Sequence, residues 1–377
     1  MDTIPNQSIH LVVTSPPYPM IEMWDASFSQ QNPTIAELLT NNLGLQAFEA
    51  MHQELTHVWK QLYRVLIPGG IMCINIGDAT RTINKTFQLY PNHAQIIKEC
   101  TNIGFSSLPE VLWRKQTNSP NKFMGSGMLP GGAYVTLEHE YILIFRKGEK
   151  RSFDDESLKK NRQESAFFWE ERNKWFSDLW EIKGTTQTLK QDSVRNRSAA
   201  FPLEIAYRLI NMYSCKEDTI LDPFVGTGTT IVAAMISKRN SIGFEIDKRF
   251  APIIEQNVQN VVEYGNSYIT DRIQNHIEFI TKRYNNEEEP KYINKNYNFP
   301  VVTNQEVNLK FDALKTYKKM SKTDLYNEYD EYEIEYELEI PTLMKIFNQQ
   351  DIGANNLTPL ATSEKSKEKN GLFNWIH

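Results

Sequence analysis

The sequence is poor in the features that mark secreted, membrane-spanning or zinc-binding chains. It holds three cysteines in 377 residues, Cys73, Cys100 and Cys215, which are far apart and form no Cys-x-x-Cys pair. We therefore expect reduced thiols in a cytoplasmic protein, with no metal site. No apolar run approaches the ~18 residues of a membrane helix, and no basic, apolar leader opens the chain. Neither secretion nor a membrane partner is expected.

A net positive charge is also missing. The chain carries a formal charge of −6, and residues 285–377 hold 16 acidic and 11 basic side chains, so most of the excess acid lies there. This distribution leaves room for a local basic groove in residues 1–284. Composition by itself gives no positive support for a nucleic-acid partner.

What is present is an alternation of short apolar runs and amphipathic segments. Strands are predicted at 9–13, 71–76, 111–113, 141–145, 219–221 and 241–245. Helices are predicted at 45–67, around 96–100, from Pro202 onward and at 230–237, with Pro68-Gly69-Gly70 ending the first of them. Strands that alternate with helices favour an α/β fold with a doubly wound, mostly parallel sheet.

Three stretches stand apart from this alternation. Residues 116–133 are rich in Gly, Pro, Ser and Asn and predict a long loop. Residues 147–195 are charged, with aromatic side chains between the charges. Beyond residue 284 the pattern decays: 287–290 has the composition of a linker, and 329–340 is typical of an edge strand or a disordered acidic stretch. The prediction is a domain at 1–284 and an acidic extension of unknown role at 285–377.

A glycine-bearing turn joins a predicted strand to a predicted helix at Asp222-Pro223-Phe224-Val225-Gly226-Thr227-Gly228-Thr229-Thr230. Two glycines let the backbone turn tightly and approach a ligand closely. No Gly-Lys-Ser/Thr follows, and Ile231 stands where a dinucleotide fingerprint has its third glycine, so a phosphate cradle is excluded. Glu245, 19 residues after Gly226, ends the next predicted strand and can accept both ribose hydroxyl protons. The pattern indicates a nucleoside site, such as one for S-adenosylmethionine; the alternative is an ordinary tight turn with a surface glutamate.

A second motif, Ser15-Pro16-Pro17-Tyr18, follows the first predicted strand. The exocyclic amine of a base is a poor nucleophile because its lone pair is delocalised into the ring. Acceptors at the Ser15 oxygen and the Pro16 carbonyl would draw the nitrogen toward tetrahedral geometry, and the prolines keep them rigid. Tyr18 offers a ring face to a base taken out of the duplex. The alternative is a proline-rich turn that only closes a strand.

Together, these motifs resemble the amino-methyltransferase family of bacterial DNA methyltransferases, in the circularly permuted order that places the catalytic motif before the cofactor motif. The resemblance covers about residues 5–255. It implies a Rossmann-like, S-adenosylmethionine-dependent methyltransferase fold with an inserted target-recognition region at 147–195. It implies catalytic roles for Ser15, Pro16, Pro17 and Tyr18, and cofactor-binding roles for Asp222, Pro223, Phe224, Gly226, Thr227, Gly228, Thr229, Glu245, Phe201 and Pro202.

Some relatives have aspartate where this chain has Ser15. In its serine the motif resembles that of the enzymes that methylate cytosine N4. The partners implied are duplex DNA with one base flipped out and a cognate restriction endonuclease, as in a restriction-modification system. No Pro-Cys nucleophile occurs, so transfer should be direct and Cys73 should belong to the core. Candidate DNA contacts are the basic side chains Lys122, Lys159, Lys160, Arg162, Arg172, Lys174 and Arg195.

Several alternatives stay open at this point. The same chemistry could act on adenine N6. It could act on RNA or a protein glutamine, although those relatives usually have Asn where Ser15 stands. The chain could also be a catalytically inactive cofactor- or DNA-binding regulator, although the intact Ser15–Tyr18 motif argues against this.

Overall fold

The computed structural model describes residues 1–115, 124–184, 201–323, 328–337 and 371–376. The chain forms two compact units. The first contains Met1–Ser152, Ser177–Leu209 and Leu221–Thr230, and the second contains Phe153–Phe176, Ile210–Ile220 and Ile231–His377. Among the described residues, no helix has both the length and the apolar character needed to cross a membrane.

The first unit is built on a sheet with the strand order β10-β1-β2-β8-β5-β9. β1 and β2 are parallel, β8 runs antiparallel to both β2 and β5, and β9 is parallel to β5. The strands are β1 (Ile9–Thr14), β2 (Leu66–Ile76), β5 (Phe105–Arg114), β8 (His139–Lys147), β9 (Leu179–Glu181) and β10 (Thr219–Asp222), of which Leu221 and Asp222 belong to this unit. The apolar runs at 9–13, 71–76 and 141–145 therefore form strands, as predicted.

Pro68-Gly69-Gly70 does not separate a helix from a strand as predicted, because β2 already begins at Leu66. The pairing of β1 with β2 shifts from Ile9–Leu66 to Leu11–Ile71, so the extra residues form a bulge. Gly69 has φ +80°, and a Cβ there would collide with the backbone of Arg151. A bulge tolerates proline and glycine where a regular strand does not.

The helices of the first unit begin with η1 (Glu22–Trp24), α1 (Asp25–Gln31) and α2 (Pro33–Thr40). They continue with α3 (Gly44–Val65) and α4 (Asn92–Ile103), which confirm the helices predicted at 45–67 and around 96–100. α3 is amphipathic and buries Phe48, Leu55, Trp59 and Leu62 at helical spacing. Cys73 is fully buried in β2, and burial raises the pKa of its thiol, which confirms its predicted place in the core.

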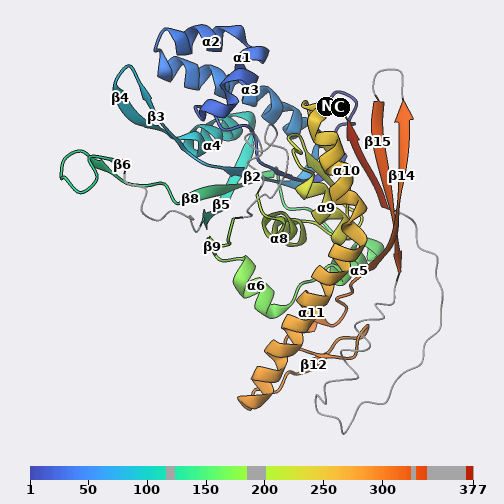
Figure 1. The fold of residues 1–377 in the computed structure, drawn as a ribbon. Coiled ribbons are helices and arrows are strands. Elements are labelled where there is room, and N and C mark those ends of the chain that lie inside the picture. The colour runs from blue at the N-terminus through green and yellow to red at the C-terminus, as the bar shows by residue number, and fades with distance from the viewer. Residues whose placement is uncertain (116–123, 185–200, 324–327, 338–370, 377) are drawn as a thin grey trace. The chain divides into compact units, whose positions relative to one another are not determined.

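Two short hairpins extend from the first unit beyond β2, β5 and β8 (Figure 1). One pairs β3 (Ala79–Ile83) with β4 (Thr86–Tyr90), and the other pairs β6 (Met124–Gly125) with β7 (Ala133–Tyr134). The long loop predicted at 116–133 is thus a hairpin from residue 124 onward, and its part at 116–123 lies outside the described residues.

The second unit has the strand order β14-β15-β16-β11. These strands are β11 (Asn240–Phe244), β14 (Ala313–Thr323), β15 (Glu328–Glu337) and β16 (Gly371–Ile376), and a separate pair joins β12 (Tyr292–Ile293) to β13 (Pro300–Val301). Its helices are α5 (Glu156–Glu164), α6 (Trp169–Trp175), η2 (Lys248–Phe250), α10 (Ala251–Gln259), α11 (Val261–Asn285) and η3 (Asn304–Glu306). α8 (Leu203–Tyr213) and α9 (Thr229–Ile236) begin in the first unit and end in the second.

The acidic segment predicted as an edge strand or disordered stretch is an interior strand. β15 pairs antiparallel with β14 on one side and with β16 on the other. Tyr332 and Ile334 are buried, whereas Glu335 and Glu337 are exposed. The alternation of acidic and apolar residues is therefore that of a strand with one buried face. Its residues 338–340 lie outside the described part of the chain.

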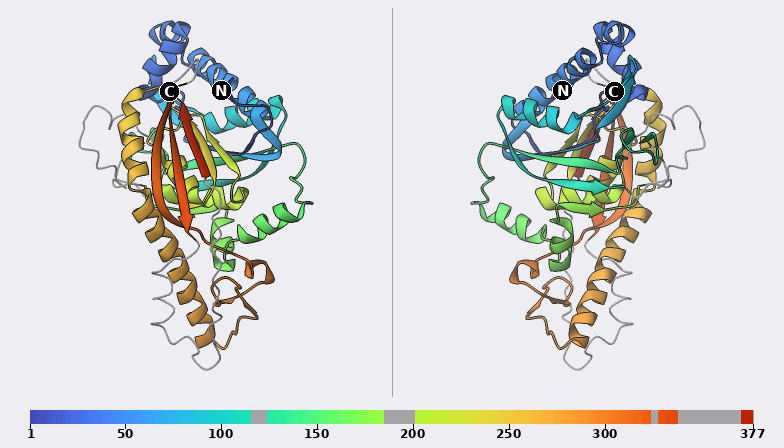
Figure 2. Two further views of the ribbon diagram at one scale, coloured as in Figure 1. Left: turned by 90° about the vertical axis from the view of Figure 1, so that its right-hand side faces the viewer. Right: turned by 90° about the vertical axis from the view of Figure 1, so that its left-hand side faces the viewer.

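Residues beyond 284 share a compact unit with the helices that precede them. Asn266 of α11 exchanges hydrogen bonds with the backbone of Leu314 in β14, at 2.7 and 2.9 Å. A Cβ at Gly265 would lie 2.9 Å from Ile236, so glycine allows α11 to approach closely. Figure 2 shows α11 running beside β14, β15 and β16. The boundary between compact units does not fall at residue 284, and the functional division at that point stays a prediction.

Candidate active site

The Ser15-Pro16-Pro17-Tyr18 loop leaves the end of β1 beside the loop that follows β10. The Thr14 hydroxyl donates a hydrogen bond to Asp222 Oδ1 at 2.6 Å, across 208 residues of sequence. The Thr230 hydroxyl donates to Asp222 Oδ2 at 2.7 Å and lies 3.3 Å from the carbonyl oxygen of Val13. The two motifs found in the sequence therefore meet at neighbouring strand ends within the first unit.

Asp222 is the group that connects these loops. Its side chain is buried, and besides the two threonine hydroxyls it accepts the backbone N–H of Phe224 at 3.1 Å. Burial raises the pKa of Asp222 to about 6, and the three donated hydrogen bonds oppose that rise. Both carboxyl oxygens are thus engaged by the chain itself. Asp222 therefore holds the two loops together through hydrogen bonds. Its predicted contact with a cofactor stays a prediction.

The glycine turn has the backbone that the sequence predicts. Gly226 has φ +52° and Gly228 has φ +84°, in the left-handed region, and the Gly228 N–H donates to the Val225 carbonyl at 2.9 Å. Within the described part of the chain, a Cβ at Gly226 would meet nothing closer than the Phe224 carbonyl oxygen at 3.9 Å. The turn therefore leaves space directly against the backbone at Gly226. This suits a ligand that packs on the backbone, as the predicted nucleoside site requires.

The other predicted cofactor residues fall in both units. Phe201 and Pro202 are buried in the first unit, and α8 begins directly after Pro202, as predicted. The side-chain oxygens of Thr227 and Thr229 lie 3.3 Å apart at the start of α9. Glu245 follows β11 in the second unit, where it accepts the backbone N–H of Asp247 at 2.8 Å.

Tyr18 is held by a polar cluster that the two motifs alone do not reveal. Its hydroxyl donates to Glu140 Oε2 at 2.9 Å and accepts from Asn75 Nδ2 at 2.9 Å. Asn75 also donates to Glu140, at 2.7 Å, and Lys115 forms an ion pair with the other carboxylate oxygen of Glu140. Burial and the charge of Glu140 raise the pKa of Tyr18 well above its usual value. Tyr18 is therefore a neutral phenol that donates a hydrogen bond to the carboxylate.

The ring of Tyr18 also has close steric support. A Cβ at Gly77 would lie 3.0 Å from Tyr18 Cε2 and 3.3 Å from Glu140 Cγ, so a glycine at the end of β2 makes room for both side chains. The Ser15 hydroxyl lies 3.3 Å from the Tyr18 oxygen, a long hydrogen bond, and Ser15 is only partly buried. The Ser15 oxygen consequently keeps accepting capacity for another molecule.

The predicted recognition insert at 147–195 is described up to residue 184. The basic candidates seen there contact their own neighbours: Lys159 pairs with Glu156, Lys160 with Glu164, and Arg162 and Arg172 lie over the rings of Phe153 and Phe176. Lys122 and Arg195 lie outside the described residues. Phe168, Trp175 and Trp180 are buried, whereas Trp169 and Phe176 are exposed. Lys174 is exposed on α6, and contacts of these basic side chains with DNA stay predictions.

Comparisons with known proteins agree with one another. A family model described as DNA methylase matches residues 9–256. The type II methyltransferase M.MthZI of Methanothermobacter thermautotrophicus is 51% identical over 333 residues, which are 88% of this chain and 92% of that protein. M.MjaI of Methanocaldococcus jannaschii, also a type II methyltransferase, is 54% identical over 269 residues, covering 68% of this chain and 88% of its own.

Solved structures with a similar fold include that of a Thermus thermophilus protein described as a putative DNA modification methylase, in complex with S-adenosyl-L-methionine. It matches with a TM-score of 0.53 and 31% sequence identity, over 69% of this chain and 89% of that one.

Proposed function

Because the chain belongs to the DNA methylase family, we propose that it transfers a methyl group from S-adenosylmethionine to the exocyclic N4 amine of cytosine in duplex DNA. The observation that carries this proposal is the bridge from Thr14 through Asp222 to Thr230, which holds the Ser15–Tyr18 loop beside the glycine turn. One loop suits the donor and the other the acceptor, so the pair supports transfer between two bound molecules.

The backbone around Gly226 and Gly228 is the surface to which we assign S-adenosylmethionine, the cofactor of this family. When bound, the cofactor supplies an electrophilic methyl group on a sulfonium. The absence of a phosphate cradle from the sequence agrees with such a ligand, since it carries no phosphate. We assign the ribose hydroxyls to Glu245, at the end of β11, and a packing role at the cofactor to Phe201 and Pro202.

The acceptor loop acts on the amine. The Ser15 hydroxyl oxygen and the Pro16 carbonyl accept its two hydrogens, which localises the nitrogen lone pair for attack on the methyl carbon. Pro16 and Pro17 fix the direction of these acceptors before the substrate arrives, so little reorganisation is needed during transfer. With S-adenosylmethionine bound, the sulfur–methyl bond would break as the new N–C bond forms, S-adenosylhomocysteine would leave, and the amine would release one proton to solvent.

Tyr18 provides the surface on which the flipped base stacks. Glu140 and Asn75 hold its hydroxyl and Gly77 admits its ring, so the ring plane is set before a base enters. Lys115 balances the charge of Glu140 in this partly buried place. These four residues are positioning residues in our proposal, because they act through Tyr18.

The choice of cytosine N4 over adenine N6 rests on Ser15, the residue typical of N4-specific enzymes. The test is to incubate the chain with labelled S-adenosylmethionine and unmodified plasmid DNA, and to digest the product to nucleosides. We expect the label in N4-methylcytosine. Label in N6-methyladenine alone would contradict the choice of base but leave the transfer reaction standing. An unlabelled plasmid, together with label transferred to RNA or protein in a parallel incubation, would contradict the DNA substrate.

The type II relatives also support a biological role. We propose that methylation protects a specific DNA sequence from a cognate restriction endonuclease, as expected of a modification enzyme. Plasmid methylated by this chain should resist that endonuclease at the mapped positions.

A further inference from the structure

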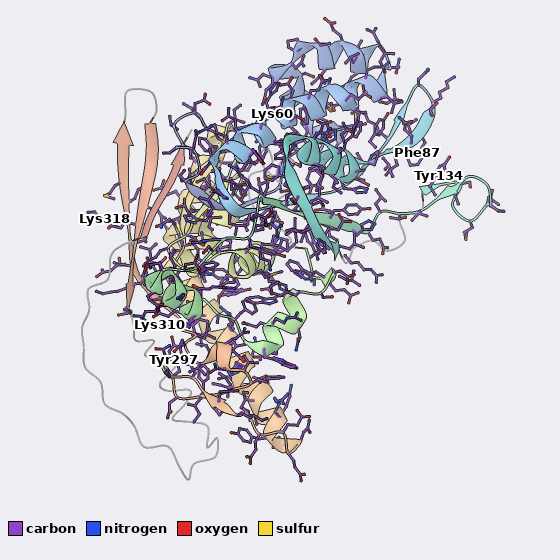
Figure 3. All side chains as sticks on the ribbon, turned by 180° about the vertical axis from the view of Figure 1, so that it is seen from behind. Lys60, Phe87, Tyr134, Tyr297, Lys310 and Lys318 are labelled. Carbon is purple, nitrogen blue, oxygen red and sulfur yellow. The ribbon has the colours of Figure 1, made fainter. Side chains whose placement is uncertain are left out.

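The two hairpins of the first unit are joined through an aromatic stack. The rings of Phe87 in β4 and Tyr134 in β7 lie with centroids 4.5 Å apart and an interplanar angle of 28°. Figure 3 shows these two side chains side by side, away from β2, β5 and β8. The turn between β6 and β7 is itself ordered, because Ser126 bonds to Leu129 and Gly132 through its side chain and backbone. The hairpins thus form one preformed projection.

The end of this projection is apolar and exposed. Met128 is 87% exposed, Leu129 70%, Val135 85% and Tyr134 49%. We call these four residues the apolar tip. Four large apolar side chains this exposed within eight residues of sequence are unusual for a surface that meets only water. The apolar tip therefore indicates contact with another molecule.

The charge of the hairpins points to the nature of that molecule. Residues 79–90 contain Arg81 and Lys85, residues 124–137 contain no charged side chain, and neither segment has an acidic one, in a chain of net charge −6. Arg81 is paired with Asp25, whereas Lys85 is exposed at the turn between β3 and β4. A projection free of carboxylates can approach a polyanion without repulsion.

The base of the projection is anchored at the candidate catalytic cluster. The backbone N–H of Lys115 donates a hydrogen bond to the backbone carbonyl of Glu138 at 2.8 Å. Lys115 and Glu138 flank the β6–β7 hairpin in the sequence, so this bond holds the base of that hairpin directly beside Glu140. On the other side, Asn92 donates to the carbonyls of Gly77 and Pro19, at 2.9 and 3.1 Å, next to the start of the β3–β4 hairpin. Both hairpins therefore leave the structure at the place where Tyr18 is held.

We propose that the apolar tip enters the DNA duplex beside the target base, where Met128 and Leu129 occupy the space that the flipped base leaves. The inference rests on the proposed function, since a base must leave the stack to reach Ser15. Apolar side chains such as Met and Leu serve as wedges between bases in other DNA-binding proteins. A wedge compensates part of the lost stacking and thereby stabilises the flipped state.

The test compares paired and unpaired targets. The methylated position is first mapped with the unchanged chain, and two oligonucleotide duplexes are built around it, one fully paired and one with a mismatch at the target base. We expect Met128→Ser/Leu129→Ser to lower kcat/KM about tenfold on the paired duplex and by less than about twofold on the mismatched one, because the wedge matters only when pairing and stacking must be broken. The matched control is Leu45→Ser, a 60% exposed leucine on α3, which should change neither.

If the double variant lost kcat/KM equally on both duplexes, or on neither, the proposal would be overturned. Conversion of a dimer to a monomer by the double variant, measured by sedimentation velocity, would overturn it in favour of a second copy of the chain as the occupant of the apolar tip. A failure of the proposed function is distinguishable, because the unchanged chain would then methylate neither duplex.

Discussion

Replacing Ser15 with alanine is expected to lower the rate of methyl transfer roughly a hundred- to a thousandfold, the loss seen when one preorganised polar group at a reacting centre is removed. The amine would keep the Pro16 carbonyl as an acceptor but lose the hydroxyl. The substitution removes one oxygen from a partly buried side chain whose hydrogen bond to Tyr18 is long, at 3.3 Å, so the fold should be retained. Single-turnover transfer to plasmid DNA measures the rate.

Binding of S-adenosylmethionine separates a catalytic role of Ser15 from a structural one. Calorimetry should give the Ser15→Ala variant a cofactor Kd within about twofold of the unchanged chain, because the glycine turn is untouched. The control is Ser107→Ala, an exposed serine on β5, which should alter neither rate nor binding. Full residual transfer, or a lost cofactor site, would contradict the role assigned to Ser15.

Replacing Asp222 with alanine should have the largest effect on stability, and should weaken cofactor binding with it. The change removes three hydrogen bonds and leaves the buried hydroxyls of Thr14 and Thr230 without their carboxylate. We expect a loss of roughly 3 kcal/mol in the free energy of unfolding, since each unsatisfied buried polar group costs about 1–3 kcal/mol. Urea denaturation and calorimetry with S-adenosylmethionine measure the two effects.

Asp222→Asn is the matched variant, because its amide can accept from Thr14 and Phe224 and donate to Thr230. Burial raises the pKa of Asp222 from 3.8 to about 6. Between these two pH values the carboxyl is therefore protonated in the folded state and ionised in the unfolded state. The stabilisation from this proton is complete below about pH 4 and is lost as the pH rises through 6. The stability of Asp222→Asn relative to the unchanged chain should therefore improve by roughly 2–3 kcal/mol between pH 4 and pH 7. If the free energies of unfolding of Asp222→Asn and of the unchanged chain differed by the same amount at pH 4 and pH 7, this would show that the carboxyl is not desolvated.

Much of the site-bearing part of the fold could be predicted because its signals are local. Pro16 and Pro17 cannot continue a central strand, and β1 indeed ends at Thr14. Gly226 and Gly228 predict positive φ, and both adopt it. The α/β class, the DNA methylase family and its S-adenosylmethionine cofactor were also predicted, and the comparisons confirm them. Cytosine N4 as the target and the individual site residues stay predictions.

The cluster around Tyr18 could not be predicted, because it depends on the order of strands in the sheet. In the sequence, Asn75 lies within the apolar run at 71–76, and Glu140 directly precedes the apolar run at 141–145. Only the antiparallel pairing of β8 with β2, which sets Asn75 opposite Ile142, brings these side chains to one place. A polar residue inside an otherwise apolar strand was the signal available in the sequence, since such a group needs a partner when buried.

The prediction of an edge strand or disordered stretch at 329–340 was wrong for a related reason. A strand of alternating acidic and apolar residues is typical of a sheet edge, and the sequence does not reveal which strands pair with it. In the structure, β15 has a neighbouring strand on each side. The hydrogen bonds of its backbone come from β14 and from β16, the latter more than thirty residues away in sequence. Pairing over such separations leaves no local trace in composition.

The most direct test of the account is a crystal structure of this chain with S-adenosylmethionine bound, in which the distance from the sulfonium sulfur to Ser15 Oγ is measured. We expect the cofactor to lie on the backbone of residues 226–228 with its methyl group directed to Ser15. The sulfur-to-oxygen distance should be roughly 8 Å or less, because the methyl carbon and one amine nitrogen lie between the two atoms, with reacting distances of about 3–3.5 Å. A cofactor bound elsewhere, or turned with its methyl group away from Ser15, would contradict it.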